Sequence, residues 1–364
     1  MFLNLTILPG DGIGPEVTEQ AVLVLQAIAE AFGHQLQLQS KNIGGAALAA
    51  ANDPLPADTI KACLASSAVL LGAVGSPAFD HYPNHLRPEA GLLRLRRELG
   101  AYANLRPAIC FPALEDCSPL RSDLIRGTDI MIVRELLGGL YFGEPRSIAG
   151  EPGSRIAINT MTYGEPAIER ISRVAFDLAM KRRKKVLSVD KANVLECSRL
   201  WREVVTRSAK DYPDVQLSHM YVDSAAMSLV QRSRDFDVVL TENMFGDILS
   251  DQAGGVVGSL GLLASASVGG PVGVYEPVHG SAPDIAGKGI ANPLGAILSA
   301  ALLLRHSFQL ETEALCIENA VSAVLNQGSR TADLVQSGKT PTRTSEMGKL
   351  VLEAVAAAAN RKSA

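Results

Sequence analysis

The stretch TENMFGDILSD, residues 241–251, places two carboxylates, Asp247 and Asp251, four positions apart. At helical spacing both side chains point to the same face of a helix, one turn apart. Like charges in this arrangement repel each other and weaken an isolated helix, and a divalent cation bound by both would offset that repulsion. The alternative is structural: Asp247 caps a helix that begins after Gly246, and Asp251 is solvated on its surface.

A third carboxylate, Asp223, follows the apolar segment 216–222, which we predict to be a strand. Carboxylate oxygens together with water are the ligands that Mg²⁺ and Mn²⁺ prefer in proteins. The three aspartates therefore form a candidate site for Mg²⁺ or Mn²⁺.

The composition indicates a globular protein that acts on a small molecule. A chain of 364 residues, 47% hydrophobic and 20% charged, can bury a large core in two domains or one elaborated domain. A net charge of −4 with interspersed signs gives no basic stripe for nucleic acid. Apolar runs are too short to span a bilayer and the N-terminus begins as a strand, so we expect no membrane partner and a cytosolic location. The five scattered cysteines, none in CxxC spacing, predict reduced and mostly buried thiols.

The chain begins as a strand, a glycine-rich turn and a helix. Residues 3–8 are apolar, PGDGIGPE follows, and residues 17–31 have helical periodicity after Pro15. The glycines do not fit the dinucleotide fingerprint GxGxxG, because Pro15 stands where the third glycine belongs. The alternation that follows predicts an α/β fold with a largely parallel sheet. We expect further strands at 35–40, 68–74 and 129–133, and helices at 56–65, 165–181, 294–306, 311–327 and 345–359, with a turn at Gly44-Gly45.

Three arginines are candidates to bind a dicarboxylate through bidentate guanidinium contacts. Arg96 and Arg106 lie in an arginine-dense segment, and Arg134 follows the predicted strand 129–133. The alternative is that they are ordinary surface arginines. His81 and His85 lie in a preceding loop, but Pro83 between them argues against a helical metal-binding pair.

Three other segments carry candidate functions. Lys191 follows a predicted strand, and it becomes a candidate proton-transfer group if desolvation or a nearby cation lowers its pKa. Residues 273–293 are rich in glycine and proline, include His279 and Asp284, and are expected to form a loop. Residues 147–162 are weakly alternating and predict either a hairpin arm for subunit contacts or a disordered surface loop.

Seven motifs occur along the chain in one order: GDGIGPE, LRLR…NLRP, RELLGGLYFG, VDKANVL, YVDSAAM, TENMFGDILSD and HGSAPDIAGKGIANP. Together they resemble the β-hydroxyacid oxidative decarboxylases of the isocitrate/isopropylmalate dehydrogenase family, from about Leu5 to Leu304. The resemblance implies a two-domain α/β fold that is not a true Rossmann fold. It further implies that residues 1–101 and 258–364 form a large cofactor-binding domain, and residues 102–257 a smaller domain for dimerisation, metal and substrate.

The resemblance also assigns roles to the candidate residues. Arg96, Arg106 and Arg134 match the family's residues that bind the malate carboxylates. Asp247 and Asp251 match metal ligands from one subunit. Asp223 and Lys191 match residues that reach across from the other subunit, which implies a homodimer with shared active sites.

The implied reaction is the NAD-dependent oxidative decarboxylation of 3-isopropylmalate in leucine biosynthesis. Lys191 would take the C2 hydroxyl proton, directly or through water and Asp223, and Tyr141 would protonate C3 after CO₂ leaves. Leu92 and Leu93, together with Val194 from the other subunit, would form an apolar wall for the branched alkyl group.

The resemblance implies that NAD is the cofactor and that Asp284 accepts hydrogen bonds from both ribose hydroxyls. NADP-preferring relatives are expected to carry Lys and Tyr at positions 284 and 285. On pattern alone, Asp284 would instead cap a turn after Pro283. The expected cofactor-binding residues are Gly75, His279, Gly280, Ser281, Ala282, Asp284, Ile285 and Asn292.

Three residues depart from the family pattern: Ser224 where Asn is usual, Leu137 where Thr is common, and Gln252 where an acidic residue is frequent. None of them belongs to the implied catalytic set, so we expect these three residues to adjust the activity rather than abolish it. The alternative functions are a tartrate or D-malate dehydrogenase and a non-catalytic regulatory subunit. The presence of every implied catalytic residue argues against the regulatory subunit.

Overall fold

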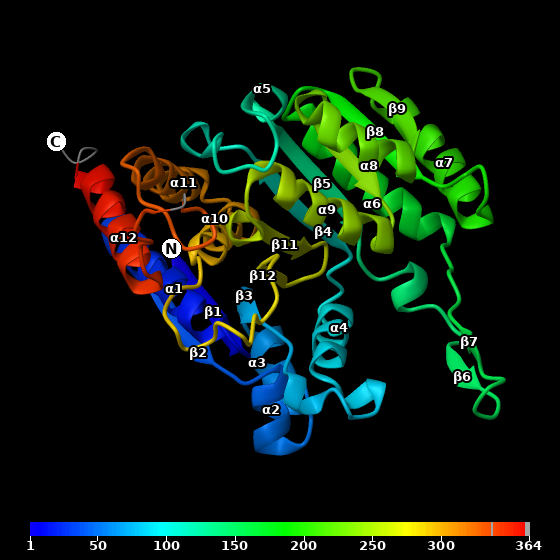
Figure 1. The fold of residues 1–364 in the computed structure, drawn as a ribbon, viewed down its shortest axis with the longest axis horizontal. Helices are drawn as coiled ribbons and strands as arrows, with labels where there is room; N and C mark the ends of the chain where they lie inside the picture. The colour runs from blue at the N-terminus through cyan, green and yellow to red at the C-terminus, as the bar shows by residue number, and fades with distance from the viewer. Residues whose placement is uncertain (336–337, 361–364) are drawn as a thin grey trace.

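The computed structural model describes residues 1–335 and 338–360, and its strands form one large sheet and one small hairpin (Figure 1). The strands of the sheet are β1 Phe2–Gly10, β2 Gln35–Ser40, β3 Ala68–Ala73, β4 Ala103–Ile109, β5 Asp129–Glu135, β8 Lys185–Asp190, β9 Gln216–Tyr221, β10 Val238–Thr241, β11 Ala264–Val268 and β12 Gly273–Pro277. The helices are α1 Gly14–Ala31, α2 Gly44–Ala51, α3 Ala57–Ala65, α4 Pro88–Glu98, α5 Ser122–Ile125, α6 Glu165–Met180, α7 Glu196–Ser208, α8 Val222–Gln231, α9 Asn243–Val257, α10 Leu294–Phe308, α11 Glu311–Asn326 and α12 Thr344–Asn360.

Two sets of parallel strands run in opposite directions and meet in the middle of the sheet, whose order is β2-β1-β3-β12-β11-β4-β5-β10-β8-β9. Strands β2, β1, β3 and β12 are parallel to one another, and so are β5, β10, β8 and β9. Between the sets, β11 is antiparallel to both β12 and β4, and β4 is antiparallel to β5. The predicted α/β fold with a largely parallel sheet is confirmed, and the strand order is not that of a Rossmann fold.

Helices cover both faces of the sheet, because successive side chains of a strand point to opposite faces. On β3, Leu70 packs in the core cluster that contains α1 and α10, whereas Leu71 packs with residues of the α2–α4 region. On β5, Val133 lies in the cluster that contains α6 and α7, whereas Ile132 packs with α8 and α9. We call the face that carries α2–α4, α8 and α9 the front, and the face that carries α1, α6, α7 and α10–α12 the rear.

The turn after β1 approaches the segment around Ser281 so closely that it requires glycine. A Cβ atom at Gly12, which has φ +58°, would lie 1.9 Å from the carbonyl oxygen of Ser281. A Cβ at Gly14 would lie 2.2 Å from the carbonyl oxygen of Pro9, and the Ile13 N–H donates to the Ser281 carbonyl at 2.8 Å. Gly12 therefore serves the close packing of two loops, and Gly14 the close approach of this turn to β1 and β3, rather than a dinucleotide fingerprint.

Most predicted elements are confirmed, and three are corrected. The helices expected at 165–181, 294–306, 311–327 and 345–359 are α6, α10, α11 and α12. Asp223 does not end a strand: β9 stops at Tyr221, and Asp223 lies in the first turn of α8, where the helix dipole favours a carboxylate. The segment 273–293 begins with the buried strand β12, and Gly44-Gly45 begins the helix α2 rather than a turn.

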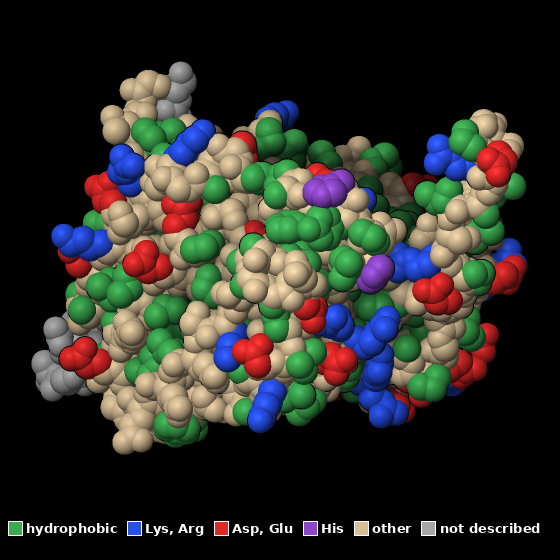
Figure 2. All heavy atoms as spheres, turned by 90° about the horizontal axis from the view of Figure 1, so that it is seen from below, with side chains coloured by type: hydrophobic (Ala, Val, Ile, Leu, Met, Phe, Trp, Pro, Cys, Tyr) green, Lys and Arg blue, Asp and Glu red, His purple; other side chains and the backbone are tan. Residues whose placement is uncertain are grey.

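Residues 147–162 contain an antiparallel hairpin, β6 Ser147–Ala149 paired with β7 Ile156–Ile158, which confirms the hairpin prediction over the disordered loop. The hairpin stands away from the body of the protein (Figures 1 and 2). Its isoleucines are exposed, with Ile148 at 71% and Ile156 at 66%. Apolar side chains on a protruding arm are suited to contact another protein surface.

The sheet continues from β11 to β4 across the predicted domain boundary, so the division into residues 1–101 with 258–364 and residues 102–257 stays a prediction.

In the described part of the chain, no helix is long and apolar enough to cross a membrane. Cys63 and Cys110 are buried, and burial raises the pKa of these thiols to about 12 and about 11.

Candidate active site

A row of polar side chains crosses the middle of the sheet on the front face. It consists of Glu276 on β12, Ser265 and Ser267 on β11, Asn104 and Arg106 on β4, and Arg134 on β5, and every one of these side chains is buried. Asn104 donates through Nδ2 to the hydroxyls of Ser265 and Ser267 at 2.7 and 3.0 Å. The point where the two parallel sets of strands meet is therefore lined by charge rather than by apolar side chains.

Arg96 reaches this row from α4 and pairs with Glu276. Its Nη2 donates to Glu276 Oε1 at 2.6 Å, and the two side chains are only 8% and 7% exposed. The Nε of Arg96 is buried and has no hydrogen-bond partner among the described residues. A buried donor without an acceptor is costly, and an acidic ligand would remove that cost.

Arg106 is held by partners on its own strand and on α9. Its Nε donates to Asn104 Oδ1 at 2.7 Å, and its Nη1 donates to the Ser250 hydroxyl at 2.6 Å. The same Nη1 lies 3.1 Å from Asp247 Oδ1 and 3.5 Å from Asp251 Oδ1. Both aspartates therefore face one guanidinium, which confirms that they share a face of one helix.

Arg134 is almost fully buried and is fixed by Asn243 and Asp247. Its Nε and Nη2 donate to Asn243 Oδ1 at 3.0 and 2.7 Å, and its Nη1 pairs with Asp247 Oδ1. Asn243 in turn donates through Nδ2 to the carbonyls of Leu136 and Gly138. The pKa of the Arg134 guanidinium is lowered, mainly because burial disfavours its charge and Arg106 repels it.

Asp247 also accepts a hydrogen bond from the Tyr141 hydroxyl, through Oδ2 at 2.7 Å. Burial works to raise the pKa of Asp247, but Arg134 and Arg106 overcome it and hold the pKa below its ordinary value. Burial, reinforced by the bond to Asp247, raises the pKa of Tyr141 to about 12. At neutral pH the pair is therefore an ionised carboxylate and a protonated phenol.

Helix α9 begins four residues before Asp247, so the structural alternative for this residue is wrong. Glu242 is the N-cap, and its carboxylate accepts from the backbone N–H groups of Met244 and Phe245 at 3.1 and 2.8 Å. Asp247 makes no capping bond, because its carboxylate is turned toward the arginines.

The Asp247–Asp251 face fits a divalent cation. Asp251 is 56% exposed, and burial together with repulsion from Asp247 raises its pKa. Nearby cations do not fully compensate the charge of such a carboxylate. Two neighbouring carboxylates of this kind typically bind a hard cation. In the described part of the chain, no three acidic, His or Cys side chains gather into a complete metal site. Within one chain the candidate metal face therefore holds two aspartates, Asp247 and Asp251.

Asp223 is brought to Lys191 and not to the other aspartates. Lys191 Nζ donates to Asp223 Oδ1 at 2.5 Å, and this hydrogen bond lowers the pKa of Asp223. Both residues lie at the end of the sheet formed by β8 and β9, and Asp223 is 62% exposed. Within one chain the candidate site residues therefore form two separate clusters.

The expected cofactor residues divide into two groups. Gly75 and Ser281 lie together, because a Cβ at Gly75 would be 3.1 Å from Ser281 Oγ, and the His279 Nε2 is buried with no hydrogen-bond partner among the described residues. A buried ring nitrogen without a partner fits a ligand beside this loop. Asn292 does not share this pattern, because it donates to Asp333 and accepts from the Leu294 N–H.

The remaining cofactor residues form a tight turn. Ala282 has φ +39°, and the Ile285 N–H donates to its carbonyl at 3.1 Å. Asp284 is exposed and makes no side-chain hydrogen bond to a described residue, so it does not form the turn cap that was the alternative to ribose binding. Gly280 has open space where a Cβ would be.

The residues expected to form an apolar wall are also separated in one chain. Leu92 and Leu93 are half-buried on α4, whereas Val194 is 61% exposed on the loop after β8.

Of the three residues that depart from the family pattern, Gln252 has a clear contact. Its Nε2 donates to the Ala226 carbonyl at 2.7 Å, and this hydrogen bond connects α9 to α8.

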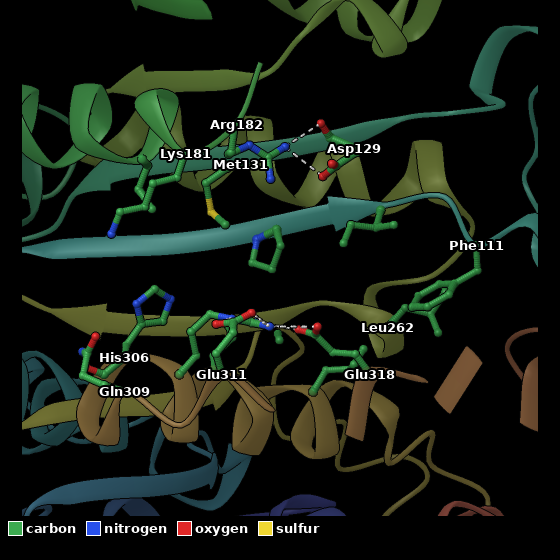
Figure 3. A pocket seen from close by; sticks show the side chains of 17 residues that line it. Phe111, Asp129, Met131, Lys181, Arg182, Leu262, His306, Gln309, Glu311 and Glu318 are labelled. Carbon is green, nitrogen blue, oxygen red and sulfur yellow. Dashed lines mark hydrogen bonds and ion pairs between the residues drawn. The ribbon is translucent and has the colours of Figure 1, made fainter. Parts of the chain in front are cut away.

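A cavity of about 690 Å³ lies on the rear face behind the arginine cluster (Figure 3). Its lining includes Pro107 and Ile109 of β4 and Met131 of β5, which alternate along the strands with the front-facing Arg106 and Arg134. Asp129 pairs there with Arg182, and Arg305 with Glu311 and Glu318. None of the candidate site residues lines it.

Sequence reasoning missed four side chains that hold the arginines. Glu276, Asn104, Ser250 and Asn243 each contact one of the three guanidinium groups. A signal was present for the first two, since Glu276 and Asn104 are polar residues at alternate positions within short apolar segments. For Ser250 and Asn243 the contacts depend on how α9 lies on the sheet, which no local pattern encodes.

The fold and the site suit a class of enzyme that acts on an acidic substrate, because three buried arginines lie beside a helix face with two carboxylates. Comparison with known proteins agrees with this class. Residues 4–351 match the family described as isocitrate/isopropylmalate dehydrogenase, and the chain belongs to that family, which consists of oxidoreductases.

Individual relatives cover nearly the whole chain. It is 54% identical over 350 residues to a 3-isopropylmalate dehydrogenase of Aquifex aeolicus, covering 96% of each chain. It is 59% identical over 336 residues to a 3-isopropylmalate dehydrogenase of Priestia megaterium, covering 92% of this chain and 91% of that one. The crystal structure of an isocitrate dehydrogenase from Methylococcus capsulatus superposes with a TM-score of 0.86 at 37% identity, covering 97% and 99%.

Asp247→Asn and Asp251→Asn form a matched pair that separates structural from metal-binding roles. In metal-free protein we expect Asp247→Asn to lower the free energy of unfolding by about 2–4 kcal/mol, because two buried guanidinium groups lose their shared carboxylate. Asp251→Asn should change it by less than about 1 kcal/mol, since this side chain is half exposed. Urea denaturation with EDTA and with added Mg²⁺ measures both effects. Equal losses without metal would contradict this reading.

Proposed function

We propose that this chain catalyses the oxidative decarboxylation of 3-isopropylmalate to 4-methyl-2-oxopentanoate, a step of leucine biosynthesis, with NAD as hydride acceptor. One observation carries the proposal: three buried arginines gather beside a helix face that presents two carboxylates. This arrangement suits a dicarboxylate held together with a divalent cation. The 52–59% identity to 3-isopropylmalate dehydrogenases supports the substrate assignment.

The arginines hold the substrate by its carboxylates. Arg96 has a free buried Nε, and an incoming carboxylate would satisfy it without displacing the bond to Glu276. Arg106 and Arg134 are already oriented by Asn104 and Asn243, so little side-chain freedom is lost on binding. Asp247 and Asp251 would hold Mg²⁺ or Mn²⁺, whose chemistry when bound is Lewis-acid polarisation of the substrate's C2 hydroxyl and C1 carboxylate.

Lys191 and Tyr141 move the two protons. When bound, NAD would supply the hydride acceptor for C2. Lys191 would take the C2 hydroxyl proton, directly or through water and Asp223, whose Oδ1 lies 2.5 Å from Lys191 Nζ. After CO₂ leaves, C3 gains a proton from Tyr141. With its pKa raised to about 12, Tyr141 is protonated at neutral pH and ready to donate.

A homodimer would bring the two clusters together. Lys191, Asp223 and Val194 lie apart from the arginines in one chain, and Asp223 and Val194 are more than half exposed. Met227 of α8 and Ile248 of α9 are exposed at 57% and 56%. These helices and the hairpin supply the apolar surface that a subunit contact needs.

The intact candidate catalytic set argues against one of the alternative functions. A regulatory subunit of the same fold would have no use for an intact catalytic set, and all its residues are present here. The remaining alternative is a tartrate or D-malate dehydrogenase, which would share the arginines and the metal face but would not need an alkyl pocket.

We expect 3-isopropylmalate to be preferred over isocitrate by at least about 10³-fold in kcat/KM, because an unpaired carboxylate buried against Leu92 and Leu93 costs several kcal/mol. Steady-state rates with 3-isopropylmalate, D-malate, tartrate and isocitrate measure the preference. Comparable rates with isocitrate would overturn the assignment, and faster rates with D-malate or tartrate would favour the alternative.

Lys191→Ala should remove most of kcat while folding and Mg²⁺ affinity stay near normal, because a general base contributes roughly 10²–10⁴-fold. Single-turnover hydride transfer measures the chemical step, and a Mg²⁺ titration of the same sample measures the metal affinity. A variant that keeps nearly full kcat would exclude this role.

Mixing two inactive variants tests whether the active sites are shared. In a heterodimer of Lys191→Ala and Asp251→Asn, one site carries both changes and the other carries neither. Random exchange of subunits should therefore restore about a quarter of the wild-type activity of a symmetric dimer. If each active site were built within one chain, mixing would restore no activity. The control is to take each variant alone through the same exchange procedure.

The cofactor preference should follow from Asp284 and Ile285. A 2′-phosphate near the Asp284 carboxylate costs about 2–4 kcal/mol, so NADP should be roughly 30- to 1,000-fold less effective than NAD. Asp284→Lys combined with Ile285→Tyr should shift the preference toward NADP, mainly by weakening NAD binding. Cofactor titrations monitored by fluorescence measure both affinities. Equal use of NAD and NADP by the unmodified protein would show that this loop is misread.

A further inference from the structure

The proposed proton-transfer pair stands at the ends of two neighbouring strands that are in register. Asp190 at the end of β8 pairs with Tyr221 at the end of β9. Lys191 follows Asp190 directly, and Asp223 follows Tyr221 by two residues. The relative orientation of these two strand ends therefore decides whether Lys191 Nζ and Asp223 Oδ1 meet at 2.5 Å.

One side chain, Arg202 of α7, contacts both strand ends. Its Nε and Nη2 donate to Asp190 Oδ2 and Oδ1, both at 2.9 Å, in a bidentate pair. Its guanidinium carbon lies 5.0 Å from the centre of the Tyr221 ring. A planar guanidinium can form both contacts at once, whereas a lysine ammonium cannot.

Asp190 carries the constraint into the turn that bears Lys191. Its side chain is only 1% exposed, and its Oδ1 also accepts from the Ala192 N–H at 2.9 Å. The Lys191 carbonyl accepts from the N–H groups of Val194 and Leu195, both at 2.9 Å. The backbone around Lys191 is thus held on one side by Asp190, which Arg202 fixes, and on the other by the turn that leads into α7, the helix that carries Arg202.

The Lys191–Asp223 contact needs such support. Asp223 is 62% exposed, and exposed ion pairs contribute little on their own because side-chain entropy opposes them. A lysine on a flexible four-carbon stem is held in one geometry only if its backbone is fixed. Catalytic groups lose much of their effect when they are displaced by about 1 Å.

We propose that Arg202 is a positioning residue that holds the turn of Lys191 and the strand end before Asp223 in the geometry for proton transfer. This inference rests on the proton-transfer role proposed for Lys191. The competing explanation is a purely structural ion pair that fastens α7 to β8 and has no particular effect on the reaction.

The first test compares Arg202→Met with Arg207→Met in the full-length protein. Arg207 lies on the same helix and pairs with Glu165 and Glu169 at the surface. We expect Arg202→Met to lower kcat by about 10- to 100-fold with the KM for 3-isopropylmalate nearly unchanged, because positioning errors of this size cost about that much. Arg207→Met should leave kcat unchanged, and Arg202→Lys should recover only part of the loss.

The second test places Arg202→Met in a Lys191→Ala background. If Arg202 acts through Lys191, removing it there should cause no further loss of kcat, because coupled residues are not additive. The same fractional loss in both backgrounds would overturn the inference, and so would a normal kcat for Arg202→Met. Should Arg202→Met fail to fold, Tyr221→Leu keeps the Asp190 pair, removes the stacking surface and is judged by the same criteria.

The two proposals fail differently. If Lys191→Ala keeps its kcat, the proton-transfer role itself is wrong and the inference falls with it. If Lys191→Ala loses kcat while Arg202→Met and Tyr221→Leu keep it, only the positioning role of Arg202 is wrong.

Discussion

Arg106 and Arg134 lie on neighbouring antiparallel strands, and both guanidinium groups contact the carboxylate of Asp247 on α9. Two buried cations side by side repel each other, and their charges are tolerable only with a carboxylate between them. This contact fixes α9 on the front face of the sheet. The position of α9 in turn brings Ser250 to Arg106, Asn243 to Arg134 and Asp251 to the edge of the cluster.

The charge balance around this contact explains how the site can accept a dianion and a dication. Arg96, Arg106 and Arg134 face Glu276, Asp247 and Asp251, so the cluster is close to neutral before any ligand binds. A dicarboxylate and a divalent cation entering together leave that balance unchanged. Either one alone would leave an uncompensated charge in a partly buried site, which is costly. The dicarboxylate and the divalent cation are therefore expected to bind together.

The sequence predicted the parts of the site that obey a local rule. The spacing of Asp247 and Asp251 placed both on one helical face, and the amphipathic periods of α6, α10, α11 and α12 were visible directly. The central strands β4, β11 and β12 were not predicted, although polar and apolar residues alternate along them. β4 and β12 each contain a proline and β11 consists mostly of Ala and Ser, so the composition by which a strand is recognised is weak there. Asp247 contacts Arg106 on β4, Arg134 on β5 and Tyr141 after β5, all more than 100 residues earlier in the chain, so no spacing rule could name them.

The two clusters of the candidate site lie in different parts of one sheet for a topological reason. Arg106 and Arg134 sit where the two parallel sets meet, on β4 and β5, and Arg96 reaches them from α4. Strand β10 lies between β5 and the strands β8 and β9, and Lys191 and Asp223 follow the ends of β8 and β9. Side chains are too short to bridge strands about 4.8 Å apart over several positions. In the proposed homodimer, a second copy of the chain would offer its Lys191–Asp223 pair from outside, and the exposed apolar side chains of Met227 and Ile248 would let it approach the front face. The separation that looks like an incomplete site in one chain is therefore what a shared active site requires of each subunit.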